Sequence, residues 1–254
     1  MRTADWTDTV SVLDRITAVF DAFGDHDEGL GVSELARRAN IPKSTVSRVA
    51  SELVAQQFLD RDGDKFYLGV RLYELGQTVE QPQRLRRLAY PVMAELRDLT
   101  GQSVQLAVME GSDVVFVAIA RSEPAVRPHA TVGGRLPVHA TALGKAVLAF
   151  SSPDVIDRVI RGGLVARTAH TITDADALVH ELRQIRSTGI ATEREECVLG
   201  RSCTASPILT AGGEALAAIS VSGATGDVMV DRMASAVRAA GATLTRRAAA
   251  ARTD

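Results

Sequence analysis

Residues 33–56, SELARRANIPKSTVSRVASELVAQ, predict two short helices joined by a tight turn. Ser33 is a suitable N-cap for the first helix, because its side-chain oxygen can accept a hydrogen bond from a free backbone N–H of the first turn. Pro42 disfavours a helical conformation at the residue before it but suits the first turn of a new helix. We therefore expect one helix to end, and the next to begin, at Pro42.

The second of these helices has one apolar and one polar face. Val46, Val49 and Leu53 recur at i, i+3 and i+7, the spacing of a buried helical face. The outward face carries Lys43, Ser44, Thr45, Ser47 and Arg48. Side chains of these types can enter a DNA major groove, where they read base edges or neutralise phosphates. The alternative is a helical hairpin whose outer face only meets solvent.

The flanking regions extend this pair into a larger unit. An apolar stripe with a Ser-x-x-Asp start pattern precedes it and predicts a first helix. The stripe consists of Val10, Leu13, Ile16, Phe20 and Phe23, and the start pattern spans Ser11 to Asp14. FLDRDGDKFYLG (58–69) follows, and its Asp62-Gly63 pair predicts a hairpin because glycine accepts positive φ. Three helices and a hairpin predict a winged helix-turn-helix, with Arg61 and Lys65 beside the tip of the wing; an ordinary surface hairpin is the alternative.

Composition limits the kind of protein and the way it can bind nucleic acid. The 254 residues are enough for two domains of roughly 100–200 residues each. Aromatic residues make up only 4% of the chain, so the core must be mostly aliphatic and alanine. The formal net charge is −2, which gives no overall cationic field toward nucleic acid. Any DNA binding must therefore come from a local patch.

Cysteine spacing and hydropathy point to a reduced, soluble protein. Cys197 and Cys203 have no second Cys or His pair at metal-binding spacing, which argues against a zinc site. The start, MRTADWTDT, is acidic and lacks an apolar region, and no run reaches the roughly 18 apolar residues of a membrane span. We expect a cytoplasmic, nucleoid-associated protein with no membrane partner, no metal and no cofactor.

A helical linker is expected between two domains. RLYELGQTV (71–79) predicts a helix, which Pro82 should interrupt. We therefore expect a DNA-binding domain at 1–70, a linker helix at 71–83 and a second domain at 84–254. A further apolar stripe runs from Leu85 to Leu99, and Pro91 inside it predicts a kink or a split.

The remainder of the chain alternates between strand and helix patterns. Strands are predicted at 103–110, 114–120, 190–195, 202–209 and 214–222, and helices at 141–150, 153–161, from Thr173 onward and from about Asp227 to Ala250. This order predicts an α+β domain, in which helices pack on an antiparallel sheet.

No motif for catalysis stands out. HATALGKA (139–146) lacks the glycine and the Ser/Thr of a phosphate loop, and His139 has no evident catalytic partner, so a structural role is the alternative to a general base. We therefore expect no enzyme. The helix that starts near Thr141 to Leu143 has free N–H groups that favour an anion, so a small carboxylate could bind there; a tight turn covering the core is the alternative.

Ordered matches along nearly the whole chain resemble the IclR family of bacterial transcriptional regulators. They are SELARRANIPKSTVSRVASEL (33–53), GDKFYLGVRLYELG (63–76), GGRLPVHATALGKAVLA (133–149), AHTITD (169–174), SCTASPI (202–208) and AAISVSG (217–223). The resemblance implies a winged helix, a linker helix and an effector-binding domain of GAF-like α+β architecture. It also implies homodimers or homotetramers on palindromic operators.

The resemblance further implies a pocket for a small organic or aromatic acid. The positions that match its lining are Leu136, Thr141, Ala142, Leu143, Glu193, Arg201, Cys203, Ser220 and Ser222. SCTASPI departs from the commoner RCVAAPI-like run and moves the arginine to Arg201. Arg201 is then either a clamp for a carboxylate, which guanidinium pairs bidentately, or an exposed loop residue. Cys203 fits a pocket wall better than a redox sensor.

Together these features predict a ligand-responsive repressor or activator that binds operator DNA. We expect Ser44, Thr45, Ser47 and Arg48 to read bases, and Lys43, Arg61 and Lys65 to contact phosphates. Arg48 is the best candidate for guanine. The alternative is a small-molecule-binding enzyme, or a scaffold, that carries an incidental helical hairpin.

Overall fold

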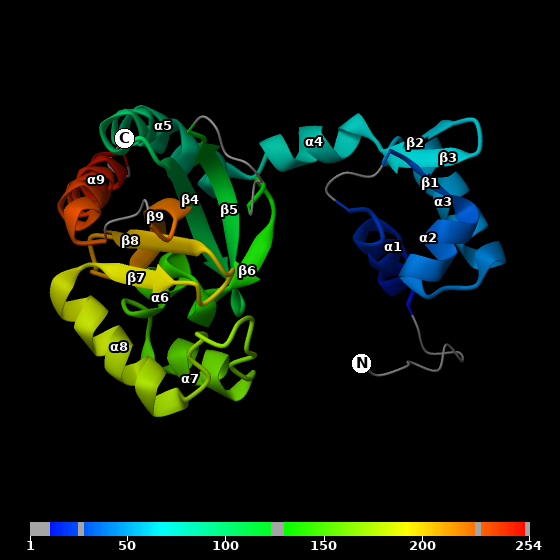
Figure 1. Cartoon of the computed structure of the whole chain (residues 1–254). Coiled ribbons are helices and arrows are strands. Elements are labelled where there is room, and N and C mark those ends of the chain that lie inside the picture. Colours follow the sequence, from blue (N-terminus) through cyan, green and yellow to red (C-terminus); the bar gives the residue numbers. More distant parts are fainter. Residues whose placement is uncertain (1–10, 25–27, 123–129, 227–229, 252–254) are drawn as a thin grey trace. The chain divides into compact units, whose positions relative to one another are not determined.

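The computed structural model describes residues 11–24, 28–122, 130–226 and 230–251. The chain forms two compact units, which divide between Glu80 and Gln81 (Figure 1). Each unit has its own buried core, so each is described by itself. The three-part division into 1–70, 71–83 and 84–254 stays a prediction.

The first unit is a winged helix-turn-helix, as predicted. Its elements are α1 (Val12–Asp21), β1 (Leu30–Gly31), α2 (Val32–Ala39), α3 (Lys43–Ala55), β2 (Leu59–Asp62), β3 (Lys65–Leu68) and α4 (Val70–Gln77). Its core includes Val19, Leu35, Val46, Leu59 and Phe66, which come from the helices and the wing alike. Burying a side chain of this size contributes about 1.5–3 kcal/mol, so one shared core holds the wing against α3.

The ends of the first elements differ from the prediction in detail. The capping box between Ser11 and Asp14 is confirmed, whereas Val10 lies outside the described residues. Gly31, not Ser33, is the N-cap of α2. The physical reason is β1, a short strand that the sequence did not predict: it pairs Leu30 with Phe66 and keeps the backbone extended up to the start of the helix.

Two turns of the first unit contain a residue with positive φ: the turn between α2 and α3, and the tip of the wing. α2 ends at Ala39, because Asn40 turns left-handed with φ of 54°, and Pro42 is the N-cap of α3. In the wing, Asp62 pairs with Lys65, so the two central residues of the turn are Gly63 and Asp64. Gly63 has φ of 59°, which glycine adopts without strain.

The two prolines of the next region do not break a helix. α4 ends at Gln77, and α5 (Glu80–Thr100) contains Pro82 in its first turn, where a missing N–H leaves no hydrogen bond unmade. α5 also continues through Pro91, so the helix is not split there, and the alternative of a kink stays a prediction. A proline inside a helix costs about 3 kcal/mol, and burial of the neighbouring Val92 and Met93 offsets that cost.

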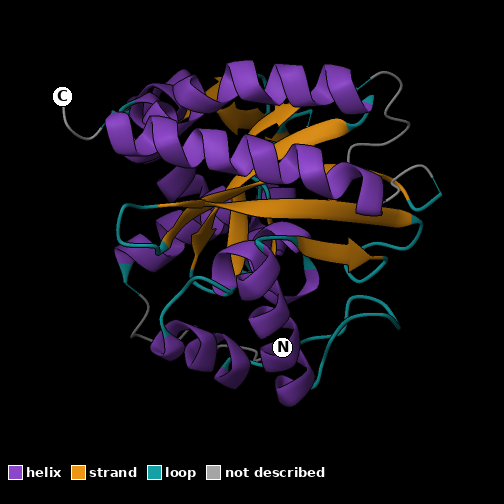
Figure 2. Cartoon of the chain, turned by 90° about the vertical axis from the view of Figure 1, so that its left-hand side faces the viewer, coloured by secondary structure: helices purple, strands orange, loops and turns teal. Residues whose placement is uncertain are grey.

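The second unit is a six-stranded antiparallel sheet between two layers of helices (Figures 1 and 2). Its strands, β4 (Ser103–Glu110), β5 (Asp113–Ala120), β6 (Arg135–Pro137), β7 (Ala191–Arg194), β8 (Arg201–Leu209) and β9 (Ala215–Ala224), lie in the order β6-β5-β4-β9-β8-β7. The helices besides α5 are η1 (Val138–Ala140), α6 (Ala142–Leu148), α7 (Pro153–Arg161), α8 (Ala175–Thr188) and α9 (Val230–Ala250). This confirms the predicted α+β class; β6 and η1 were not predicted.

Side-chain alternation along the strands divides the core of this unit in two. In β9, Ile219 and Val221 pack with α5 and α9. Ala218 belongs instead to the cluster with α6, α7 and α8. Because successive residues of a strand point to opposite faces, Ser220 and Ser222 lie on the α6 side as well. Polar side chains are thereby buried between the sheet and α6, where the candidate site lies. No helix within the described ranges is long and apolar enough to cross a membrane.

Candidate functional site

The first candidate surface is the outward face of α3. Val46, Val49 and Leu53 are buried, as the spacing predicted. The structure leaves four of the predicted DNA-binding side chains of this helix exposed, namely Lys43, Ser44, Ser47 and Arg48. Thr45 differs from them, because it is half-buried at the edge of the core. The face is thus continuous along the first half of the helix.

Arg48 is held in place by a neighbour on the same face. Its Nη1 donates to Glu52 Oε1 at 3.1 Å, and both side chains are more than half exposed, at 62% and 63%. An exposed pair at this i,i+4 spacing contributes only about 0.3–0.5 kcal/mol. A guanine or a phosphate can therefore replace Glu52 at little cost.

The two predicted wing residues are exposed and bonded locally. Arg61 donates from Nε to the carbonyl of Gly63 at 3.0 Å, and its guanidinium lies 5.6 Å from the centre of the Phe66 ring. Lys65 donates from Nζ to the carbonyl of Glu28 at 3.1 Å. Both cations thus lie beside the tip of the wing, as the sequence predicted.

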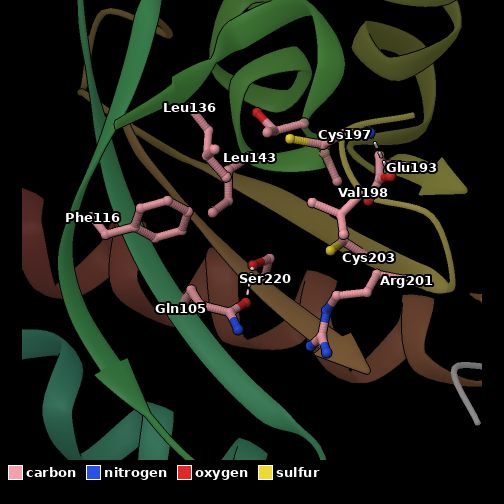
Figure 3. Close-up of a pocket in the computed structure, with 12 residues that line it drawn as sticks. Gln105, Phe116, Leu136, Leu143, Glu193, Cys197, Val198, Arg201, Cys203 and Ser220 are labelled. Carbon is pink, nitrogen blue, oxygen red and sulfur yellow. Dashed lines mark hydrogen bonds between the residues drawn. The ribbon is translucent and has the colours of Figure 1, made fainter. Parts of the chain in front are cut away.

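The second candidate site is a cavity between α6 and the sheet of the second unit, with about 380 Å³ of empty space including its open mouth (Figure 3). Its lining consists of Gln105, Phe116, Leu136, Thr141, Ala142, Leu143, Glu193, Cys197, Val198, Arg201, Cys203 and Ser220. Eight of the nine positions suggested by the resemblance are among them, and Ser222 is the exception.

Four lining residues were not anticipated. Gln105 and Phe116 come from β4 and β5, and Cys197 and Val198 come from the turn between β7 and β8. The sequence signal for this strand is Gln105 itself, a polar residue between the apolar Val104 and Leu106. The turn has no such signal, since its place at the cavity depends on the pairing of β7 with β8.

A buried polar network forms one side of the cavity. Ser220 donates from Oγ to Gln105 Oε1 at 2.8 Å, and Gln105 donates from Nε2 to Ser222 Oγ at 2.6 Å. Arg201 Nη2 also donates to Ser222, at 3.4 Å. Ser222 therefore supports the network from behind the lining.

Arg201 begins strand β8 and lines the cavity, so it is not an exposed loop residue. Its Nε is buried and has no hydrogen-bond partner among the described residues. A buried donor without a partner is costly, at about 1–3 kcal/mol. An anion in the cavity would relieve that cost, because guanidinium binds carboxylate oxygens in a planar, bidentate manner.

Glu193 of β7 also lines the cavity, where it is the direct cross-strand partner of Cys203 in β8. Its Oε1 accepts from the backbone N–H of Glu196 at 2.7 Å and of Cys197 at 3.2 Å. Burial raises the pKa of this carboxyl above its usual value. Burial likewise raises the pKa of Cys203, and it raises the pKa of Cys197 to about 11. Both thiols stay protonated at neutral pH, which fits a wall of the cavity rather than a reactive site.

The HATALGKA segment forms the helical wall. Thr141 is the N-cap of α6, accepting from the N–H of Gly144 at 3.1 Å, and Lys145 is buried against carboxylates rather than turned toward the cavity. His139 donates from Nε2 to the carbonyl of Val165 at 3.1 Å, and burial lowers its pKa.

Within the described ranges, no group of His, Cys, Asp or Glu side chains is arranged to hold a metal ion.

Two family models match the chain. The model described as the bacterial transcriptional regulator IclR C-terminal domain matches residues 77–246, and that of the IclR helix-turn-helix domain matches residues 12–63. The HTH-type transcriptional regulator BhcR of Paracoccus denitrificans (strain Pd 1222) is 33% identical over 234 residues, which cover 90% of this chain and 84% of that protein. The transcriptional repressor IclR of Escherichia coli (strain K12) is 30% identical, covering 91% of this chain and 86% of that protein.

A solved structure is similar to this chain over nearly its whole length. The crystal structure of an IclR homolog complexed with 4-hydroxybenzoate, from Microbacterium hydrocarbonoxydans, has a TM-score of 0.85 at 31% identity, and covers 94% of this chain and 100% of that chain. The matches include both the winged helix-turn-helix and the unit that holds the cavity. The chain belongs to the IclR family of bacterial transcriptional regulators.

Proposed function

We propose that this regulator binds operator DNA through α3 and the wing, and that a small aromatic acid in the cavity of the second unit changes that binding. The observation that carries the proposal is the cavity itself, which places Arg201 beside an apolar wall; the buried Nε of Arg201 has no hydrogen-bond partner in the described part of the chain. The 4-hydroxybenzoate in the Microbacterium homolog is a ligand of this chemical class.

On the DNA side, Ser44, Ser47 and Arg48 would read base edges in the major groove. Thr45, half-buried, would add contacts at the edge of this face. Lys43 and the wing cations Arg61 and Lys65 would neutralise phosphates. Because the net charge of the chain is −2, affinity would depend on this local set of cations rather than on a general field. We further propose a homodimer or homotetramer, whose two-fold symmetry matches a palindromic operator.

On the ligand side, Arg201 would pair with the carboxylate. Phe116, Leu136 and Leu143, which line the cavity, would contact the ring of an aromatic acid. Occupancy changes DNA binding only if the ligand has different affinities for two states of the protein, which is the requirement for any coupling between distant sites. We also propose that the chain is not an enzyme, since thiols with raised pKa values are poor nucleophiles.

The DNA proposal is tested with Arg48→Ala on an operator obtained by selection from random duplexes. Loss of a guanine contact should cost about 1–3 kcal/mol, or about 5- to 150-fold in specific affinity. Arg161→Ala, an equal change of charge on α7 of the second unit, is the matched control and should leave affinity unchanged. Undiminished specific affinity in Arg48→Ala would contradict the proposed reading face.

The ligand proposal is tested by calorimetry with 4-hydroxybenzoate and with 4-hydroxybenzamide, which has the same ring but no carboxylate. Arg201→Ala should weaken binding of the acid at least tenfold, the effect of losing a hydrogen bond to a charged group of about 1.5 kcal/mol or more. Binding of the amide should be the same in both proteins. Equal affinity of wild type and variant for the acid would reject the clamp.

A further inference from the structure

Lys145 is a fully buried cation directly behind the cavity wall. It lies on α6, two residues after Leu143, but does not line the cavity. Its Nζ donates to Glu181 Oε1 at 2.5 Å, and to both carboxylate oxygens of Glu196 at 2.7 and 2.9 Å. A buried ammonium is tolerated only when it is paired and hydrogen-bonded, so these contacts hold α6 and both carboxylates in one arrangement.

The two carboxylates belong to different elements. Glu181 comes from α8, whereas Glu196 comes from the turn 195–200 that joins β7 to β8. This turn supplies Cys197 and Val198 to the cavity lining. Lys145 therefore connects the helical wall of the cavity to the wall formed by the turn.

The turn is held by polar contacts rather than by a core of its own. Glu195 has φ of 58°, a left-handed conformation that costs a residue with a side chain. Thr168 Oγ1 donates to the carbonyl of Glu195, and Thr171 Oγ1 donates to that of Glu196, each at 2.6 Å. Leu199 at its outer side is 64% exposed. An unfavourable backbone therefore depends on the surrounding hydrogen bonds and on the ion pair.

We propose that the Lys145–Glu196 ion pair positions turn 195–200 as a wall of the cavity, so that Lys145 controls ligand affinity without touching the ligand. Lys145 is thus a positioning residue, distinct from Arg201, which would contact the carboxylate. The part of the proposal that concerns affinity rests on the proposed function, but the position of the turn does not. Two measurements separate them.

The first measurement is hydrogen exchange of the whole chain without ligand. The N–H groups of Glu196 and Cys197 donate to Glu193, so they report directly on the turn. Glu196→Gln should speed their exchange about tenfold or more, the effect of weakening one hydrogen bond between charged groups. Glu181→Gln removes the other partner of Lys145 and is the matched control: it should lower stability but leave these two amides protected.

The second measurement is calorimetry with 4-hydroxybenzoate on the same variants. Glu196→Gln should weaken binding about tenfold relative to Glu181→Gln. Lys145→Met should behave like Glu196→Gln in both measurements, and Lys145→Arg should restore part of the loss; the two glutamine variants decide the matter if Lys145→Met does not fold.

The outcomes are distinct. Faster exchange at both amides and weaker binding in Glu196→Gln alone support the proposal. Unchanged exchange in Glu196→Gln, or equal acceleration in Glu181→Gln, overturns it, as does wild-type affinity in Glu196→Gln. Absence of 4-hydroxybenzoate binding by the wild type argues against the proposed ligand, and the exchange data then decide the position of the turn by themselves.

Discussion

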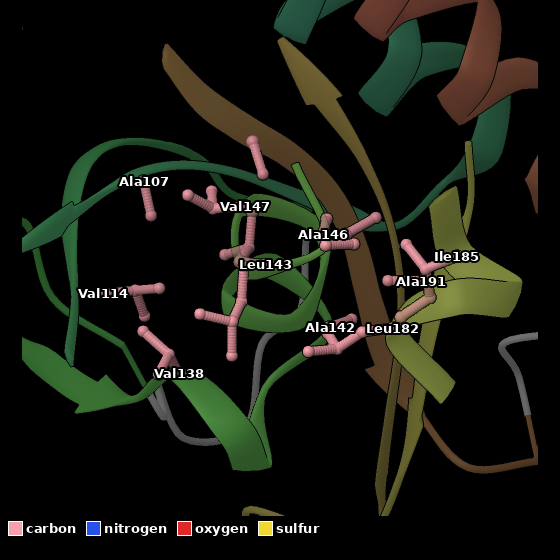
Figure 4. Packing of buried hydrophobic residues seen from close by; sticks show 14 of the residues in the cluster. Ala107, Val114, Val138, Ala142, Leu143, Ala146, Val147, Leu182, Ile185 and Ala191 are labelled. Atoms are coloured by element: carbon pink, nitrogen blue, oxygen red, sulfur yellow. The ribbon is translucent and has the colours of Figure 1, made fainter. Parts of the chain in front are cut away.

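Replacing Gly144 with alanine should disturb the cavity through one methyl group. Gly144 lies in α6, next to Leu143, which belongs to the same buried cluster as Val138 of η1 (Figure 4). A Cβ at this position would lie 2.2 Å from the carbonyl oxygen of Val138 and 2.3 Å from its Cα. Both are backbone atoms, so no side-chain rotation can relieve the overlap.

The size of the effect follows from this geometry. Ordinary contact begins at 3.4 Å, so α6 and η1 must separate by 1.2 Å near Gly144. Overpacking costs about 1–3 kcal/mol, and a backbone clash favours the upper end, while alanine returns about 1 kcal/mol through helix propensity. The net loss of about 2 kcal/mol should lower the melting temperature of the second unit by about 4–8 °C. Ligand affinity should fall as well, because Ala142 and Leu143 line the cavity on the same turn of helix.

Differential scanning calorimetry of the whole chain measures this change. Gly76→Ala is the matched control, since a Cβ at Gly76 in α4 meets no atom of the described residues within 4 Å. That variant should gain up to about 1 kcal/mol from helix propensity. A melting temperature of Gly144→Ala at or above the wild-type value would refute the argument that the close approach of α6 and η1 leaves no room for a side chain.

Three further predictions concern single residues. Asn40→Ala should cost about 1–2 kcal/mol in urea unfolding, because alanine is strained at the left-handed φ of 54°, whereas Asn40→Gly should cost nothing; equal stability of both variants would contradict this. Lys43→Gln should reduce the slope of log affinity against log salt by about 1 without changing the preferred operator, and an unchanged slope would remove Lys43 from the phosphate contacts. The raised pKa of Glu193 means that the folded state holds this proton more tightly, so stability is full below the ordinary value of 4.5 and is lost as pH rises through the higher folded pKa. Glu193→Gln should therefore gain stability relative to wild type as pH rises above 4.5, and a constant difference in urea unfolding from pH 4.5 to 8 would contradict it.

Much of the fold follows from local patterns in the sequence. Pro153–Arg161 is a helix with the predicted bounds, because Pro153 begins a strongly amphipathic stretch. The β4–β5 hairpin follows from two alternating runs around Gly111, which turns with φ of 65°. Two short strands were not predicted. β1 and β6 are two and three residues long, and each forms only because a distant strand offers it hydrogen-bond partners.

The two candidate sites differ in how many of their residues could be predicted from the sequence. The outward face of α3 was predicted from helical spacing alone, since its polar and apolar residues alternate within one element. The lining of the cavity was suggested by a family resemblance, and local spacing would not have assembled it. Gln105 and Ser220 meet because β4 pairs with β9 at that register. Arg201 and Ser222 meet because β9 also pairs with β8.

By itself, then, the sequence determined the winged helix-turn-helix, the α+β class of the second unit and the polar face of α3, because each depends on side chains close together in the chain. Only the tertiary structure decided that α5 runs through Pro91 and that turn 195–200 forms a wall of the cavity beside Lys145. The physical reason is that burial and ion pairing are set by partners far away in the chain. Buried neighbours offset the cost of a proline inside a helix, and the folded chain brings Lys145 to Glu181 and Glu196, which are 36 and 51 residues away.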